Sequence, residues 1–224
     1  MSPKLAQQLA ERIADEVMAA DWPVGSLLGT ERELCERYGV SRNVLREAIR
    51  ILEFQEVVFM REGAGGGLTV TAPTSASVAE CAVVYLEGKG LTPGELFEAR
   101  VIIESLAARL AAENATEATA GRLRTALELE ETLEHRREPG VAVPDSLHMT
   151  IADLSGNPLI RLLEEVFQHI TVHLFPRALF NERRNVIRTS HKKIAGAIQN
   201  GDADLAERYM VAHLTAAGAE LDDA

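Results

Sequence analysis

The 224-residue sequence is poor in aromatic residues and in cysteine, and it has no long hydrophobic run. Aromatic side chains make up 4% of the residues, and this scarcity beside abundant alanine, leucine and glutamate favours packed helices over sheets. Cys35 and Cys81 provide no framework of disulfide pairs, which fits a reducing compartment. No apolar run reaches the roughly 18 residues of a membrane span, and the N-terminus lacks the pattern of a secretory signal. We therefore expect a cytoplasmic, mostly helical protein that makes no membrane contact.

Positive charge is also scarce, because 23 Lys and Arg residues stand against 34 Asp and Glu residues, for a net charge of −11. This balance disfavours nucleic-acid binding unless basic residues are concentrated locally. Such a concentration lies between Ser41 and Arg50, where three arginines accompany one acidic residue. Salt screens charges beyond about 8 Å, so attraction to phosphate depends on the local charge. The basic segment can therefore dock on DNA, while the acidic remainder disfavours docking by another face.

Local signals near the N-terminus predict a helix-turn-helix. Apolar residues recur with helical spacing over residues 4–20, and a break at residues 21–25 follows. The sequence TERE at residues 30–33 has the capping-box pattern of a helix start. Gly39 ends this short helix, and Ser41 is a good N-cap for a second helix over about residues 42–53. Two short helices joined by a tight turn that contains glycine are typical of this motif.

A wing is expected directly after the helix-turn-helix. Residues 57–60 and 68–71 resemble two strands around a glycine-rich tip at residues 63–67. The alternative for this tip is a phosphate-binding loop. It is disfavoured because the tip leads into a strand rather than a helix, and because no Lys-Ser or Lys-Thr pair follows.

Arg42, Arg46 and Arg50 are four residues apart and therefore share one face of the second helix. The opposite face is apolar, so the arginines should point outward. Arginine bonds guanine bidentately, and helix N-terminal amides hold phosphate, so this arrangement suits a helix in the major groove. The alternative is an ordinary solvated arginine face, which the caps, the turn and the hairpin make less favoured. The candidate DNA contacts are Arg32, Ser41, Arg42, Arg46, Arg50 and Gly63.

Residues 28–50, LGTERELCERYGVSRNVLREAIR, resemble the signature of GntR-family regulators, which commonly reads LPSERELA, then GVSR and VREAL. The departures are Gly29 for Pro, Cys35 for Ala and Leu45 for Val, and they remove no expected DNA contact. The resemblance implies DNA contacts by Arg32, Ser41, Arg42 and Arg46, with Glu62 or Gly63 at the wing tip. Arg50 is added from the helical face alone.

The remainder of the chain shows no strand pattern and predicts an all-helical bundle. The seven expected helices lie near residues 76–87, 93–113, 116–137, 144–155, 158–175, 183–199 and 202–219. The fold class is therefore mostly α. We expect a winged helix-turn-helix domain at residues 1–72, a linker at 73–76 and a helical domain at 77–224 that binds an effector and dimerises.

Arg100 is the candidate effector-binding residue of the helical domain. It borders a predicted buried stripe that consists of Leu96, Ala99, Ile103, Leu106 and Leu110. One interpretation is an ordinary ion pair with Glu104, one turn further on. The other is a cation that receives the carboxylate of a ligand, because arginine recognises carboxylates bidentately.

His148, His191 and His213 lie on the apolar sides of three different expected helices. One such histidine is usually a satisfied core residue. Three together favour a shared metal ion, because imidazole is a common nitrogen ligand of transition metals. His169 and His173 form a pair spaced by four, which we interpret as edge or interface residues and as weaker metal candidates.

The second half of the chain resembles the FCD ligand-binding domain of the FadR-like GntR subgroup. The resemblance is carried by Glu98-Ala99-Arg100 with Glu104, by His148 leading to Ser155-Gly156-Asn157, by His191 with Ala197-Ile198 and Gly201-Asp202, and by His213-Leu214. It implies an organic-acid effector and a metal, with Zn²⁺ and Ni²⁺ as the candidates, held by one Asp and three His in the same pocket.

One expected metal ligand departs from the family pattern. The family's Asp lies four residues before the first histidine, and Pro144 stands there in this chain. Asp145, three residues before His148, is the candidate substitute. The alternatives are a site of three histidines with water, or a pocket without metal.

These patterns together predict a transcription regulator rather than an enzyme. We expect a homodimer that binds a palindromic operator on double-stranded DNA and responds to a small carboxylate effector. The alternative function is a metal-dependent enzyme that acts on a carboxylate substrate. It is disfavoured because Asp145 is the only general base in place and because a DNA-reading module has no use in such an enzyme. A purely architectural DNA-binding protein is disfavoured because idle buried polar groups are costly.

Overall fold

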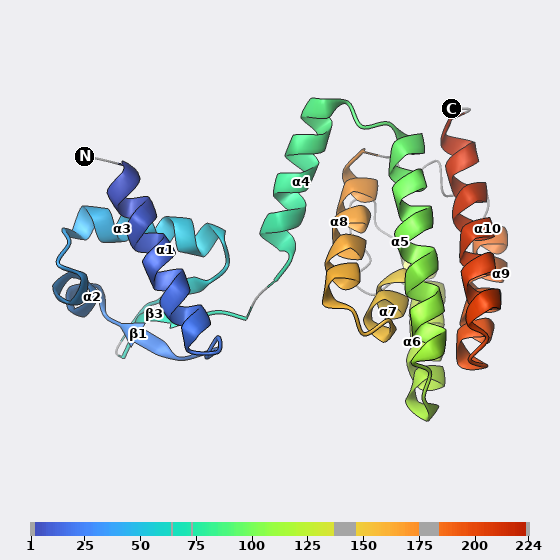
Figure 1. Ribbon diagram of the computed structural model, residues 1–224, viewed down its shortest axis with the longest axis horizontal. Coiled ribbons are helices and arrows are strands. Elements are labelled where there is room, and N and C mark those ends of the chain that lie inside the picture. The colour runs from blue at the N-terminus through green and yellow to red at the C-terminus, as the bar shows by residue number, and fades with distance from the viewer. Residues whose placement is uncertain (1–2, 64, 73, 137–146, 175–183, 223–224) are drawn as a thin grey trace. The chain divides into compact units, whose positions relative to one another are not determined.

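The computed structural model describes residues 3–63, 65–72, 74–136, 147–174 and 184–222. The chain divides into two compact units, Met1–Ser77 and Val78–Ala224 (Figure 1). Each unit has an apolar core of its own.

The elements described in the N-terminal unit are α1 (Pro3–Ala19), β1 (Leu27–Gly29), α2 (Glu31–Tyr38), α3 (Arg42–Phe54), β2 (Val58–Arg61) and β3 (Gly67–Val70). The predicted caps are present, because Thr30 and Glu33 form the reciprocal capping box at the start of α2. Gly39 ends α2 with a φ of 65°, a left-handed conformation that favours glycine. The Ser41 side chain accepts a hydrogen bond from the N–H of Val44 at 3.4 Å and begins α3. The predicted helix-turn-helix is therefore confirmed.

One face of α3 is seated on the core of this unit. Its buried residues are Val44, Leu45, Ala48, Ile49 and Leu52. Helix α1 packs against α3 and contributes Ile13 and Val17 to the same cluster. Burying a large aliphatic side chain stabilises a fold by about 1.5–3 kcal/mol. The apolar face therefore determines which side of α3 is left to solvent.

The sheet has the strand order β1-β3-β2, and both pairs are antiparallel. Strands β2 and β3 form the predicted wing. Strand β1 was not predicted, because three residues are too few to show an alternating pattern. It pairs with β3 so closely that a Cβ at Gly67, where φ is 154°, would lie 2.5 Å from the carbonyl oxygen of Gly29. Only glycine fits at position 67.

The described part of the C-terminal unit contains seven helices: α4 (Ala76–Lys89), α5 (Pro93–Glu113), α6 (Glu117–Arg136), α7 (Leu147–Leu154), α8 (Pro158–Leu174), α9 (Arg184–Gln199) and α10 (Ala203–Asp222). Where the residues are described, the predicted helices agree with these bounds to within three residues; residues 137, 144–146, 175 and 183 of the expected helices lie outside the described residues. Within those residues, none of the helices is long and apolar enough to cross a membrane.

The buried face of α5 differs from the predicted apolar stripe. Leu106 is 43% exposed, so its predicted burial is wrong, whereas Arg100 and Glu104 are buried. The reason is that α5 lies along α10 (Figure 1) through small residues. A Cβ at Gly218 of α10 would lie 2.9 Å from the Cβ of Phe97. Close packing on alanine and glycine selects a different face from the one that leucine spacing indicates.

Candidate DNA-binding and metal-binding sites

The exposed face of α3 carries the three arginines of the predicted DNA-reading helix. Arg42, Arg46 and Arg50 are all exposed, one turn apart. Ser41 is exposed at the N-terminal end of the same helix, where the first backbone N–H groups have no partner within the helix. This end of α3 therefore offers guanidinium groups and free amides to a polyanion.

Acidic neighbours hold several of these arginines in place. Glu31 accepts hydrogen bonds from Nε and Nη2 of Arg46, at 3.0 and 3.2 Å. Glu47 accepts one from Nη1 of Arg50 at 3.2 Å. Arg32, on α2, lies 3.8 Å from Glu36. Exposed ion pairs of this kind are worth about 0–1 kcal/mol, so DNA can displace them.

The wing tip is rich in glycine. Gly63 has a φ of 94° and accepts a backbone hydrogen bond from Gly66 at 3.0 Å. Nη2 of Arg61 donates to the carbonyl oxygen of Gly65 at 2.7 Å, so this arginine braces the turn. Gly63 therefore presents bare backbone at the tip, which suits a close approach to a groove.

In the helical unit, three histidines from α7, α9 and α10 meet. The Nε2 atoms of His148 and His191 are 3.1 Å apart, and those of His191 and His213 are 3.3 Å apart. His148 and His191 are buried, and His213 is partly buried. Residues 43 and 22 positions apart in the sequence thus bring three ring nitrogens together.

Each histidine has a separate partner on its other ring nitrogen. Nδ1 of His148 is bonded to Glu104 of α5. Nδ1 of His191 lies 2.8 Å from Oε2 of Glu130 on α6, whose Oε1 also accepts the N–H of Leu147 at 2.9 Å. Nδ1 of His213 lies 2.8 Å from the hydroxyl of Ser190. These partners fix the orientation of all three rings.

The carboxylates of Glu104 and Glu130 determine which ring nitrogen of His148 and of His191 carries a proton. Burial opposes ionisation of Glu104, but Arg100 and His148 outweigh it and lower its pKa to about 2. Burial likewise opposes ionisation of Glu130, and its bond to His191 lowers its pKa nonetheless. An ionised carboxylate only accepts hydrogen bonds, so Nδ1 of His148 and of His191 carries a proton.

His213 has the same tautomer for a different reason. The Ser190 hydroxyl donates its single hydrogen to the carbonyl oxygen of Ile187 at 2.7 Å. It therefore accepts from His213, whose Nδ1 carries the proton. Burial, with the two nearby histidines, lowers the pKa of His213 to about 2, and burial also lowers the pKa of His148.

The consequence is that the Nε2 atoms of the three rings face one another. The three Nε2 atoms lie 3.1–3.3 Å apart along the chain of contacts, and each is the ring nitrogen that is left over when Nδ1 donates to its own partner. A cation between them would be coordinated by their lone pairs. Three imidazole nitrogens are a donor set suited to Zn²⁺ or Ni²⁺, so the residues fit such an ion.

A buried charged group adjoins the histidines. Nε of Arg100 donates to Oε1 of Glu104 at 2.5 Å, and its guanidinium lies 5.0 Å from the centre of the Phe97 ring.

A second buried carboxyl group, that of Glu164 on α8, is 1% exposed, and among the described residues its Oε2 has no hydrogen-bond partner. Burial, then the charge of Glu104, raises the pKa of Glu164 well above its ordinary value.

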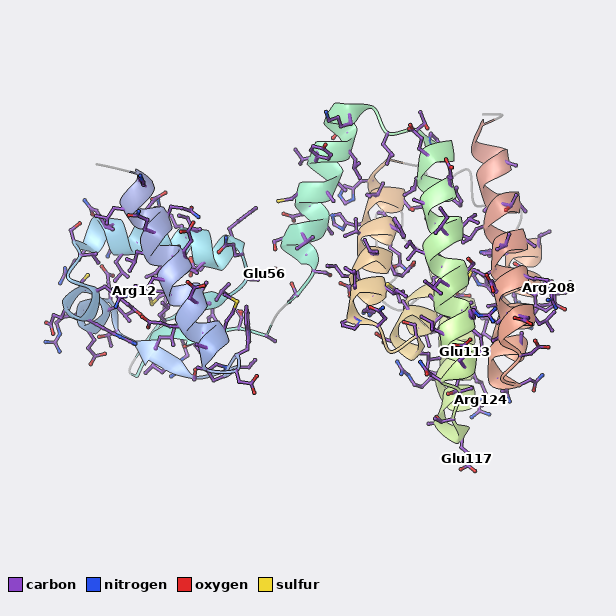
Figure 2. All side chains as sticks on the ribbon, viewed as in Figure 1. Arg12, Glu56, Glu113, Glu117, Arg124 and Arg208 are labelled. Atoms are coloured by element: carbon purple, nitrogen blue, oxygen red, sulfur yellow. The ribbon has the colours of Figure 1, made fainter. Side chains whose placement is uncertain are left out.

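A cavity of about 230 Å³ is lined by residues of α6 and α9. Glu130, which bonds His191, is one of its lining residues, together with Arg124, Arg188 and Lys192. Figure 2 labels Arg124 and Glu117, which both belong to α6. The lining is mixed in charge, because Glu128 and Glu131 accompany Glu130 beside these basic residues.

The remaining candidates are placed differently. Asp145 and Pro144 lie outside the described residues. His169 and His173 are neighbours on α8, with ring centres 4.3 Å apart, and belong to no cluster of three metal-binding groups in the described part of the chain. Sequence reasoning missed Glu130, Ser190 and Glu164. Glu130 gave no signal because it stands in an acidic stretch that is typical of a solvated helix face.

Comparison with known proteins agrees with this two-part organisation. The family model described as bacterial regulatory proteins, gntR family, matches residues 5–67, and the FCD domain model matches residues 95–216. The Uxu operon transcriptional regulator of Escherichia coli is 30% identical over 93% of this chain and 83% of its own length. The HTH-type transcriptional regulator LutR of Bacillus subtilis is 30% identical over 85% of this chain and 89% of its own length.

A further relative and a solved structure extend the comparison. The HTH-type transcriptional repressor NanR of Citrobacter rodentium is 27% identical over 96% of this chain and 85% of its own length. The structure of Streptococcus agalactiae GntR has a similar fold, with a TM-score of 0.67 at 21% identity over 96% of this chain and 99% of that chain. These relatives are regulators rather than enzymes, so the alternative metalloenzyme function is not supported. The chain belongs to the GntR family of bacterial transcription regulators and carries an FCD domain behind its winged helix-turn-helix.

Proposed function

We propose that this regulator acts in the cytoplasm as a homodimer that binds a palindromic operator and is controlled by a small carboxylate effector in a metal-containing helical pocket. The observation that carries the pocket is the convergence of three histidine Nε2 atoms whose other nitrogens are all committed to partners. Two copies are expected because helix-turn-helix operators mirror the symmetry of the protein.

The DNA contacts proposed are those on α2, α3 and the wing tip. Arg42, Arg46 and Arg50 would reach base edges or phosphates from the exposed face of α3. Ser41 and the free amides of α3 would hold a phosphate, and Arg32 would contact the backbone or groove edge. Gly63 would approach the minor groove. Arg50 is the least direct of these, because it lies furthest from the N-terminal end of α3.

The metal ligands proposed are His148, His191 and His213. Asp145 is kept as the candidate fourth ligand, with water as the alternative. A divalent ion bound there supplies a Lewis-acidic position for an oxygen of the effector. The chain's own residues orient the three rings through Glu104, Glu130 and Ser190, which engage the Nδ1 atoms and leave the Nε2 atoms facing one another.

The effector proposed is a small organic acid bound by Arg100. The buried guanidinium adjoins the histidines through Glu104, so one carboxylate ligand could engage both the cation and the metal. Effector binding would repack the bundle and shift the population of arrangements of the two recognition helices.

The test combines metal, effector and DNA measurements on the full-length protein. Thermal shift with a panel of organic acids, with and without Zn²⁺ or Ni²⁺, should give a rise in melting temperature that needs both components. Fluorescence anisotropy on a DNA sequence selected from a random pool should show binding that the same acid alters. Sedimentation should give a dimer. No preference for any duplex over random competitor would overturn the DNA half, and no response to acid, metal or chelator would overturn the pocket.

A further inference from the structure

Glu104 is hydrogen-bonded both to Arg100, the candidate effector residue, and to His148, a candidate metal ligand. Its Oε1 accepts from Nε of Arg100 at 2.5 Å, and its Oε2 accepts from Nδ1 of His148. All three side chains are buried, so water does not weaken either bond. One carboxylate is therefore shared between the two functional groups of the helical domain.

We propose that Glu104 positions His148 for metal binding, and that Arg100 weakens this effect by sharing the same carboxylate. This inference rests on the proposed function, because it needs a divalent ion at the three histidines. It goes further by giving the effector residue a direct influence on metal affinity.

The effect of Glu104 on His148 follows from the chemistry of the imidazole ring. A carboxylate that accepts the Nδ1 proton fixes the tautomer and the ring orientation, and makes Nε2 a stronger electron donor. Partners of this kind typically change metal affinity by about 10–100-fold when they are removed. Glu130 has the same relation to His191, so two of the three rings are held in this way.

The opposing effect of Arg100 follows from its charge. The guanidinium draws on the same carboxylate, so the bond that Glu104 makes to His148 is weaker than it would be without Arg100. A ligand carboxylate that takes over Arg100 releases Glu104 to His148 alone. Metal and carboxylate ligand then raise each other's affinity, since coupling between two sites is reciprocal.

Glu164 provides a matched comparison in the same pocket. Its ligand atom lies within 4.8 Å of those of Glu104 and His148, yet no hydrogen bond to a histidine is described for it. A glutamine there removes no partner of a histidine ring and keeps the size of the side chain. A glutamine at position 164 therefore tests whether any buried Glu-to-Gln change in this pocket disturbs the metal.

The experiment measures Zn²⁺ affinity of the full-length, EDTA-treated protein by competition with a chromophoric chelator at fixed pH. Glu104→Gln should weaken Zn²⁺ binding by about 10–100-fold. Arg100→Gln should tighten it by at least about threefold, a modest change for one shared charge. Glu164→Gln should stay within about twofold of wild type, and in the Glu104→Gln/Arg100→Gln double variant the tightening should disappear.

The outcomes separate the inference from the function on which it rests. Wild-type protein that binds no Zn²⁺ overturns the metal site and the inference together. Wild-type affinity in Glu104→Gln overturns the inference and leaves the metal site standing. Unchanged or weaker binding in Arg100→Gln overturns the sharing of the carboxylate. Arg100→Lys keeps the charge and should bind Zn²⁺ like wild type, and the absorption spectrum of bound Co²⁺ reports whether each variant retains the ligand geometry.

Discussion

Glu31 holds Arg46 by one edge of its guanidinium, accepting from Nε at 3.0 Å and from Nη2 at 3.2 Å. Glu31 begins α2 and Arg46 lies in the middle of α3, so the pair ties the two helices of the helix-turn-helix together at the surface. The other edge of the guanidinium stays available to a base. Because the Arg46 side chain is 64% exposed, the pair is weak enough for DNA to rearrange.

Arg46→Lys should lower sequence-specific DNA binding while leaving non-specific binding nearly unchanged. Lysine keeps the charge but cannot bond a guanine, or Glu31, with two parallel hydrogen bonds. We expect a loss of about 1–3 kcal/mol in discrimination at one base position. Fluorescence anisotropy with the selected operator and with single-base variants at two salt concentrations measures this loss.

The control for Arg46→Lys is Arg208→Lys, an exposed arginine of α10 in the helical domain (Figure 2). It should alter neither affinity. An equal loss of specific and non-specific binding in Arg46→Lys would mean that Arg46 contacts phosphate rather than a base.

Gly67→Ala should destabilise the N-terminal unit by about 1–3 kcal/mol. The added Cβ meets the carbonyl oxygen of Gly29, which is backbone and cannot swing away. Urea unfolding followed by tryptophan fluorescence reports this unit, because Trp22 is the single tryptophan and bonds the carbonyl of Thr71 at 2.8 Å. The control is Gly121→Ala in α6, where the added Cβ has no atom within 4 Å. This variant should stabilise the helix by about 0.5–1 kcal/mol, measured by unfolding followed by circular dichroism. A Gly67→Ala variant as stable as wild type would contradict the close approach of β1.

The helix-turn-helix could be predicted from sequence because its signals are local. Thr30, Gly39 and Ser41 act on residues within four positions of themselves, so the caps and the turn are visible without knowledge of the rest of the fold. Strand β1 could not be predicted, because its pairing with β3 depends on residues about forty positions away.

The candidate metal site likewise contains residues that could be predicted from sequence and residues that could not. His148, His191 and His213 could be selected because each lies on the apolar side of its own helix. Glu130 could not, because an acidic residue on a charged helix becomes a buried partner only when another helix brings His191 to it. Local periodicity also misplaced Leu106, since the face that α5 buries is decided by the close approach of α10.

His213→Gln should abolish the stabilisation of the helical domain by Zn²⁺. Removal of one of three nitrogen donors leaves two, and metal that binds only the folded state raises stability by about 2.7 kcal/mol at one hundred times its dissociation constant. Thermal unfolding followed by circular dichroism, before and after addition of Zn²⁺ to EDTA-treated protein, measures the effect. The control is His173→Gln, an exposed histidine of α8 that should keep the full rise. If His213→Gln still responds like wild type, the ion binds elsewhere.

Glu164→Gln should gain stability relative to wild type as the pH rises from about 4.5. In the folded protein, burial and then the charge of Glu104 raise the pKa of Glu164, whereas in the unfolded chain the group ionises near its ordinary value of 4.5. Stability that wild type has below pH 4.5 is therefore lost as the pH rises toward the folded pKa, by up to about 1.4 kcal/mol per pH unit. Glutamine does not titrate, so it does not share this loss. Urea unfolding of EDTA-treated protein at pH 4.5, 6.0 and 7.5 gives the difference in free energy of unfolding at each pH.

The control is Glu165→Gln, which removes a carboxylate paired with Arg161 at 2.6 Å and should show no such growing advantage. A constant difference for Glu164→Gln would mean that Glu164 is ionised in the fold and that Arg100 compensates two carboxylates rather than one.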